Sequence, residues 1–188
     1  MDKHLKEIKK QQDEYKKKFK CDEDGRVVVD LCVHNDDNFL SPYSSSENAV
    51  LTEEVADFIE NNLKNVPHDK RIKLAIHGET ITLDEQDQYE KAIHRHFSES
   101  YQKVKTDKSR LTKISFIMAI IAVLVLSIMF TLEFAIDINA VAIEVIDIIA
   151  WVFMWEAVDI FFLQCAALRR KEKRYLSLID SKIEFDKI

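Results

Sequence analysis

Two long apolar stretches dominate the pattern of hydrophobic and polar positions along the chain. The first, at 114–134, is apolar except for three hydroxyl side chains and one late acid: Ser115, Ser127, Thr131 and Glu133. The second, at 144–168, is apolar between a few acids. Each stretch is close to the roughly 20 residues that a helix needs to cross a bilayer. The sequence therefore predicts a membrane hairpin of two transmembrane helices, joined by an acidic connection at 135–143.

Basic residues indicate how this hairpin lies in the membrane. Lysines and arginines gather at 101–113 and directly after Leu168, whereas the connection at 135–143 has none. Positive residues stay on the cytoplasmic side of a membrane and are attracted to anionic lipid headgroups. We therefore predict a multi-pass protein of the cell (inner) membrane with both termini in the cytoplasm and with anionic lipids as partners.

The region before the membrane has the pattern of a small α/β domain. Apolar and polar residues alternate at 26–34 and 71–77, which is typical of strands. Between them, Thr52 precedes a helical pattern that ends before Pro67. A strand, helix and strand in this order predict a parallel crossover. Because two strands alone are not stable, we expect a third from Glu79–Thr82 or from another copy of the chain.

A long helix follows this domain. Thr82 and Glu85 have the spacing of a capping box, and apolar residues then recur at helical spacing as far as Val104. Nothing breaks this pattern before the membrane, so the stalk and the first transmembrane helix should form one rod of about 50 residues. The predicted fold is an α-helical membrane hairpin with a small N-terminal cytosolic α/β (βαβα) domain, which occupies 26–100 and runs into the stalk helix.

Both ends of the chain are predicted to be helical. The charged segment at 1–20 fits a short coiled coil or a helix lying on an anionic leaflet. The segment at 169–188 fits a cytosolic C-terminal helix whose apolar face packs against the stalk.

Charge and motif content exclude several classes of function. The chain has 33 acidic and 27 basic residues, and its basic residues collect in the N-terminal segment and beside the membrane. Nucleic acid is therefore not an expected partner. The sequence has no glycine-rich phosphate loop, nucleophile elbow or zinc-hydrolase helix, so we predict that the protein is not an enzyme.

The second apolar stretch carries a row of acidic and aromatic side chains. A Glu and an Asp three residues apart occur twice, and at about 100° per residue these pairs share most of one helix face with two tryptophans. We call this row the acidic stripe: Glu144, Asp147, Trp151, Trp155, Glu156 and Asp159. Counting back from Arg169 predicts that the second pair lies near the bilayer middle and the first pair near the far interface.

A carboxylate inside a membrane normally has a partner, but 114–168 contains no basic residue. Three arrangements remain: protonation with a hydrogen bond to Ser127 or Thr131, clustering in a homo-oligomer, or a bound cation. The stripe could therefore join helices or conduct cations or protons, unless the membrane register differs from that given by counting back from Arg169. Joining and conducting both predict self-association.

A third candidate site lies where the two predicted strands end. His34 and Asp36 follow the first strand, and His77 ends the second. Parallel strands end at the same edge of a sheet, where open α/β folds bind their ligands. These residues could hold a divalent metal ion or a small anionic ligand, and solvated polar residues at strand ends are the alternative.

Two resemblances concern the membrane region. The order of Trp155, an acid, two apolar residues and Asp159 resembles the pore signature of the mitochondrial calcium uniporter, but Ile160 replaces the proline of that motif. Calcium selectivity is therefore not implied. From Arg26 onward, the order of elements and the segment from Ile146 to Asp159 resemble a group of small uncharacterised two-span membrane proteins of bacteria. That resemblance implies the architecture and a bacterial origin, and no activity.

These patterns lead to two hypotheses. In the first, the protein is a homo-oligomer whose cytosolic domain senses or scaffolds and whose acidic hairpin conducts or titrates cations or protons. In the second, the hairpin is a non-conducting anchor, and the cytosolic domain is an adaptor or regulator that binds a protein partner.

Overall fold

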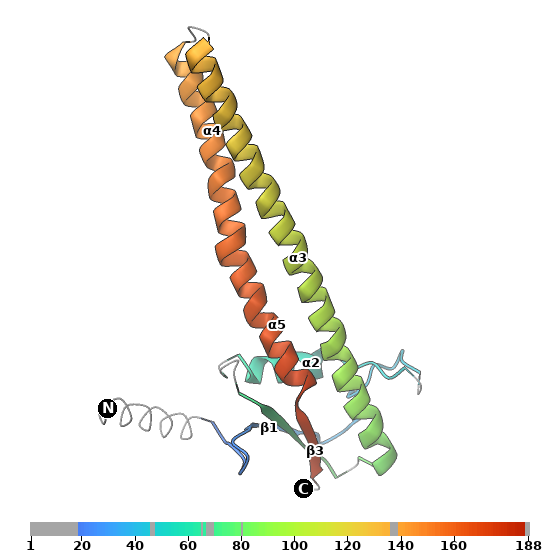
Figure 1. Ribbon diagram of the computed structural model, residues 1–188. Coiled ribbons are helices and arrows are strands. Elements are labelled where there is room, and N and C mark those ends of the chain that lie inside the picture. The colour runs from blue at the N-terminus through green and yellow to red at the C-terminus, as the bar shows by residue number, and fades with distance from the viewer. Residues whose placement is uncertain are drawn as a thin grey trace, which may run out of the picture. The chain divides into compact units, whose positions relative to one another are not determined.

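The computed structural model describes residues 19–45, 48–64, 66, 70–79, 81–135 and 139–186 (Figure 1). The chain forms two compact units. The sheet unit comprises Met1–Tyr101 and Lys173–Ile188, and the helical unit comprises Gln102–Glu172. The described residues are mostly helical and include one small parallel sheet. Nearly all of the helix predicted at 1–20, and part of the connection at 135–143, fall outside the described residues.

The sheet has three parallel strands in the order β1-β2-β3. Their bounds are β1 (Val27–Cys32), β2 (Ile72–His77) and β3 (Lys182–Asp186). The first two confirm the predicted strands, and their parallel pairing confirms the predicted crossover. Alternate residues face opposite sides, so Val29, Leu74 and Ile183 form one row on the apolar face.

The prediction for the third strand was wrong. It comes from the chain's own C-terminus, and the helix predicted over 169–188 ends earlier, because α5 (Cys165–Ile179) is followed by β3. Ser181 helps to end the helix, since its hydroxyl donates a hydrogen bond of 2.6 Å to the Leu178 carbonyl. The backbone of β2 then pairs with β3 on the side away from β1, which satisfies polar groups that would otherwise be exposed at an edge.

Helices from three parts of the chain complete the core of the sheet unit. Crossover helix α2 (Glu53–Asn62) confirms the helix predicted after Thr52. Fully buried side chains come from α2, β2, α5 and the start of the long helix: Ile59, Ile76, Leu178, Ile93 and Phe97. The Phe97 and Tyr175 rings lie 6.1 Å apart, which confirms the predicted packing of the tail against the stalk.

The long helix α3 (Leu83–Ala135) is continuous over 53 residues. Its start is fixed by Glu85, whose carboxylate accepts a hydrogen bond of 2.7 Å from the Thr82 backbone N–H. This is one half of the predicted capping box, and it satisfies a donor that the helix itself leaves unpaired. Stalk and apolar segment thus form a single helix, as the sequence predicted.

The polar segment before α2 is packed against the sheet unit rather than extended from it. The buried Phe39 ring stacks on Tyr89 of α3 at 4.3 Å, and the Thr52 N–H donates to the Phe39 carbonyl. Tyr89 also donates a hydrogen bond of 3.1 Å to Asp36. These contacts hold the end of β1 beside the first turns of α2.

Candidate functional site

Helix α3 contains a segment that is long and apolar enough to cross a membrane. Among the described residues it is the one helix that passes this test of length and composition. Only 11% of its most apolar 18-residue window is buried by the rest of the chain. A core helix of a soluble protein is mostly buried, so the exposure favours a lipid environment for this segment.

A second helical segment packs antiparallel to α3 within the helical unit. It consists of α4 (Ala140–Asp159), a π-helical turn η1 (Ile160–Gln164) and the first part of α5. The Ser115 hydroxyl donates a buried hydrogen bond of 2.8 Å to the Ala157 carbonyl. Small buried residues, Ala122 on α3 and Ala150 on α4, let the two backbones approach closely.

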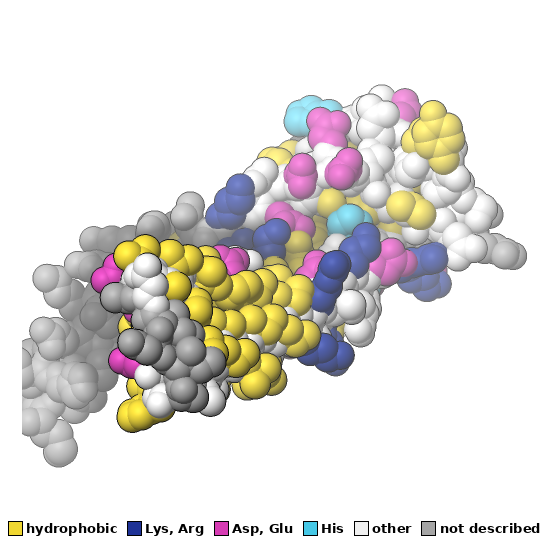
Figure 2. Space-filling model, turned by 90° about the horizontal axis from the view of Figure 1, so that it is seen from above, with side chains coloured by type: hydrophobic (Ala, Val, Ile, Leu, Met, Phe, Trp, Pro, Cys, Tyr) yellow, Lys and Arg dark blue, Asp and Glu magenta, His cyan; other side chains and the backbone are white. Residues whose placement is uncertain are grey.

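The outer surface of this helix pair is apolar (Figure 2). Large hydrophobic side chains are about half exposed along both helices, among them Ile120, Leu124, Ile128, Val145, Ile148 and Val152. Leaving one such side chain in water instead of burying it costs about 1.5–3 kcal/mol. The pair therefore favours an apolar solvent or further protein around it.

The contacts between α3 and α4 show which part of α3 lies level with each residue of the acidic stripe. Asp159 lies between Ala157, which binds Ser115, and Phe161, whose ring lies 6.4 Å from Phe116. Asp159 is therefore level with the beginning of the apolar segment of α3. Leu124, the middle of that segment, lies nine residues beyond Ser115, so it is level with about Ile148, nine residues before Ala157.

This register differs from the one predicted by counting back from Arg169. The count took Arg169 as the interfacial end of the second stretch, but Cys165 of that stretch lies beside Thr112, which belongs to the basic segment before the first stretch. Asp159 consequently lies near the basic end, not in the middle. Asp147 lies at about the level of the middle, whereas Glu156 lies about eight residues, or about 12 Å along the axis, closer to the basic end.

The stripe residues face away from α3. Trp151 and Trp155 are 54% and 66% exposed, whereas Ala150 and Ala157 on the opposite side of α4 are buried. Glu144 and Glu156 are exposed, and Asp147 and Asp159 are half-buried. One chain therefore presents the two tryptophans and the two glutamates of the stripe on its outer surface, with Asp147 and Asp159 partly covered.

The predicted partners of the stripe have other bonds. The Ser127 and Thr131 hydroxyls donate to carbonyls of their own helix, at Val123 and Ser127. Asp159 accepts a hydrogen bond of 3.0 Å from Gln164 across the π-helical turn. In the part of the chain that the structure describes, no side-chain partner is seen for Glu144, Asp147 or Glu156.

The π-helical turn beside Asp159 determines which later side chains of the helix face α3. Buried Ala150 and Ala157 are seven residues apart, and buried Cys165 follows eight residues later. The Cys165 N–H donates to the Ile160 carbonyl, five residues back, so the turn accommodates one extra residue. Cys165 thereby faces α3, where its sulfur lies 3.6 Å from the Thr112 hydroxyl.

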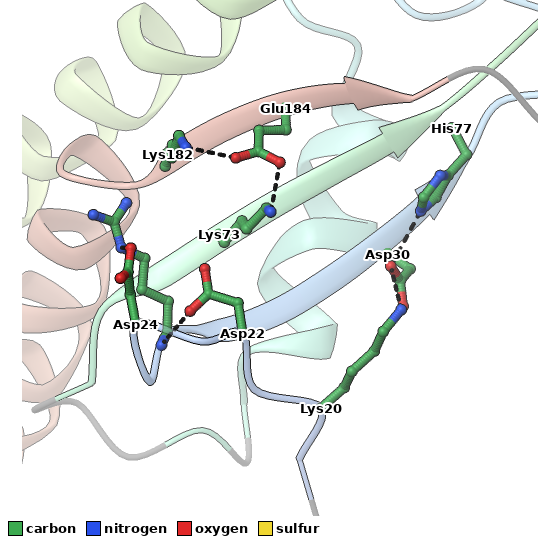
Figure 3. A network of polar contacts seen from close by, with 9 residues as sticks. Lys20, Asp22, Asp24, Asp30, Lys73, His77, Lys182 and Glu184 are labelled. Atoms are coloured by element: carbon green, nitrogen blue, oxygen red, sulfur yellow. Dashed lines mark hydrogen bonds and ion pairs between the residues drawn. The ribbon is translucent and has the colours of Figure 1, made fainter.

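On the sheet unit, charged residues cover the face of the sheet opposite α2 (Figure 3). Asp30 accepts hydrogen bonds from Lys20 at 2.9 Å and from His77 at 3.1 Å, and these two bonds hold its pKa below the usual value. Glu184 bonds Lys182 and Lys73, which lower its pKa to about 2.

The ion pairs of Asp30 and Glu184 predict that the sheet unit loses stability in acid. Glu184 has a lower pKa in the folded chain than its ordinary 4.5, so its contribution is complete above about pH 4.5 and disappears as the pH falls toward 2. We expect hydrogen exchange of β2 and β3, corrected for intrinsic rates, to accelerate over this range in the wild type. Glu184→Gln should show a weaker acceleration, and an equally steep change in both proteins would contradict the assignment.

The candidate metal ligands are not brought together. His77 bonds Asp30, Asp36 accepts the bond from Tyr89, and His34 is exposed. Among the described residues, no group of three or more His, Cys, Asp or Glu side chains is placed to hold a metal ion. His34, Asp36 and His77 therefore do not form a metal site within the described residues.

A cavity of about 340 Å³ lies at the end of β1, beside the first turns of α2. Its apolar walls include Val33, Phe39 and Phe58, and its polar lining includes Asn35 and Glu54. The Phe58 side chain is 44% exposed at this cavity. The alternating pattern at 182–186 was the missed signal for Lys182 and Glu184, because it is typical of a strand.

Comparison with protein-family models found no match to this chain, and neither did comparison with curated proteins or with solved structures.

Proposed function

We propose that the chain is a two-span integral membrane protein of the inner membrane, in which α4 crosses beside α3 and both termini are cytoplasmic. The observation that carries the proposal is the exposed apolar surface around the whole antiparallel pair, with basic residues at its stalk end. Helix α4 carries four acids, so length and composition alone do not identify it as a span. Its packing on α3 supports its insertion together with α3.

We further propose that several copies associate through the acidic stripe. An Asp at the centre of a transmembrane helix costs about 2.5–3.5 kcal/mol for insertion. Asp147 lies near the middle of the pair and is half-buried, and Glu156 lies nearer the basic end and is exposed, so in a single chain lipid would surround Glu156 and part of Asp147. Facing copies would replace that lipid with polar partners and shared cations. Two helices cannot enclose a pore, so a cation pathway lined by these acids requires an oligomer.

The second candidate function is a membrane-anchored adaptor that does not conduct ions. The sheet unit favours it, because the cavity at the end of β1 and the charged face of the sheet are open surfaces in the described part of the chain. In this case the stripe holds helices together, and a cytosolic protein is the functional partner.

Flux through liposomes separates the two functions. The purified chain is reconstituted, and K⁺ and H⁺ fluxes are compared between the wild type and the Asp147→Asn, Glu156→Gln double variant. The proposed pathway predicts flux in the wild type and at least a tenfold loss in the variant. Asp159→Asn is the matched control, because Asp159 is held by Gln164 near the basic end and should retain most of the flux.

Crosslinking in the same liposomes reports association. Wild-type flux with an intact oligomer in all three proteins, and loss only in the double variant, supports conduction. An oligomer without flux in the wild type, at any pH or voltage tested, overturns conduction and leaves the adaptor. A monomer without flux overturns association through the stripe as well.

A further inference from the structure

The outer edge of β1 has backbone groups that are not used by the sheet. The N–H groups of Val27 and Val33 donate to carbonyls of the β2 segment at 2.9 and 2.8 Å. Backbone direction alternates along a strand, so Val28, Asp30 and Cys32 point their N–H groups away from β2.

Only the first part of this edge is covered in the described residues. The Val28 N–H donates to the Lys20 carbonyl at 2.8 Å, where the chain runs back along β1. Beyond it, the described part of the chain contains no backbone partner for the N–H groups of Asp30 and Cys32. A strand edge without backbone partners is a template for pairing with another extended chain.

The cavity lies beside the end of β1, where the described residues leave the edge without a backbone partner. Leu31, Cys32 and Val33 of the strand line it on one side, and Val55 and Phe58 of α2 line it on the other. An added strand at β1 would place alternate side chains toward α2. The half-exposed Phe58 ring and the buried Phe39 ring offer apolar contact to one such side chain.

The rim of this groove is acidic. Glu54 belongs to its lining, and Glu53 and Asp57 are exposed on the same helix. Across the cavity, Asp37 is hydrogen-bonded to the lining residue Asn35 at 3.0 Å. A ligand with lysines or arginines beside its apolar residue would complement this charge.

We propose that the groove between the edge of β1 and α2 is a docking site for an extended basic peptide of a partner protein. The peptide adds as a fourth strand beside β1 and inserts one apolar side chain between Phe39 and Phe58. This site belongs to the sheet unit and does not depend on ion conduction by the acidic stripe.

The probe is a fluorescein-labelled nine-residue peptide of alternating valine and lysine, added to the full chain in phosphatidylcholine nanodiscs. A peptide with N-methyl groups on alternate backbone amides keeps the charge but cannot add as a strand. We expect the unmodified peptide to bind at least tenfold more tightly than the N-methylated one. A scrambled peptide of the same composition measures the contribution of charge alone.

Three variants of the chain test where the peptide binds. Phe58→Lys removes the aromatic wall and repels the peptide, so affinity should fall at least tenfold. Tyr43→Lys is the matched control, since Tyr43 is an exposed aromatic residue outside the cavity lining, and it should bind like the wild type. Cys32→Pro removes an outward N–H from an edge strand, where proline is tolerated, and should also weaken binding.

Several results would overturn the proposal. Equal binding of the N-methylated or scrambled peptide would show attraction by charge, without strand addition. An equal loss in Phe58→Lys and Tyr43→Lys would place the peptide elsewhere. Binding that appears only after deletion of residues 1–18 would make this chain's own basic N-terminal segment the occupant, and no binding in either form would exclude a peptide site.

Discussion

A chain that ends after Ser181 should lose the folded state of the whole sheet unit, and not just its last strand. Removing β3 leaves two strands, which are marginal in water on their own. It also removes Ile183 and Phe185, the residues that pair with Leu74 and Ile76 in the apolar rows of the sheet. The expected loss exceeds the whole stability of a small unit, which is on the order of 5 kcal/mol.

Hydrogen exchange of the full membrane-embedded protein measures this effect. Amides of β1 and β2 should be protected in the wild type and should exchange at nearly unfolded rates in the truncated chain. The matched control keeps the strand but removes its charged face, by Lys182→Ala with Glu184→Ala. Protection of β1 and β2 that survives the truncation would show that β3 is dispensable.

Phe97→Ala should strongly destabilise the sheet unit through a single side chain. Phe97 is fully buried on α3 and packs against Tyr175 of α5 at 6.1 Å. Truncating a buried phenylalanine costs about 3–5 kcal/mol, because the lost apolar burial is combined with a cavity. The same ring connects the stalk to the helix that leads into β3.

Urea unfolding of the sheet unit tests this prediction, with proteolysis of its loops as the measure of the unfolded fraction. Ser98→Ala is the control on the same helix turn, since Ser98 is exposed and its substitution should shift the midpoint little. A Phe97→Ala midpoint equal to that of the control would show that the stalk and α5 are not held together by this contact.

The sequence predicted those elements whose pattern is local. Alternation identified β1 and β2, the Thr82 and Glu85 pair identified the start of α3, and the absence of breakers predicted its continuity. β3 was missed because its five residues follow a helical pattern directly, and only pairing with β2 distinguishes a short strand from a frayed helix end. Such pairing is a long-range contact that no local pattern encodes.

The sequence predicted which face of the helix carries the acidic stripe, but it did not predict how far along the helix pair each acid lies. Helical spacing places Asp147, Trp151 and Trp155 on one side of α4, and the structure leaves both tryptophans exposed there. Depth depends on the level at which α4 meets α3, which the Ser115 and Ala157 contact sets. The cavity beside β1 was not predictable, because it depends on how Phe39 folds back onto Tyr89.

Labelling with an impermeant maleimide determines whether the chain crosses the membrane twice. In a background with Cys21, Cys32 and Cys165 replaced by serine, single cysteines are introduced by Ser98→Cys, Asn139→Cys and Asp180→Cys in bacterial cells. Two crossings predict that Asn139→Cys is labelled in intact cells, whereas Ser98→Cys and Asp180→Cys are labelled only after permeabilisation. Labelling of Asp180→Cys in intact cells, from the same side as Asn139→Cys, would show that α4 does not cross and would contradict the two-span topology.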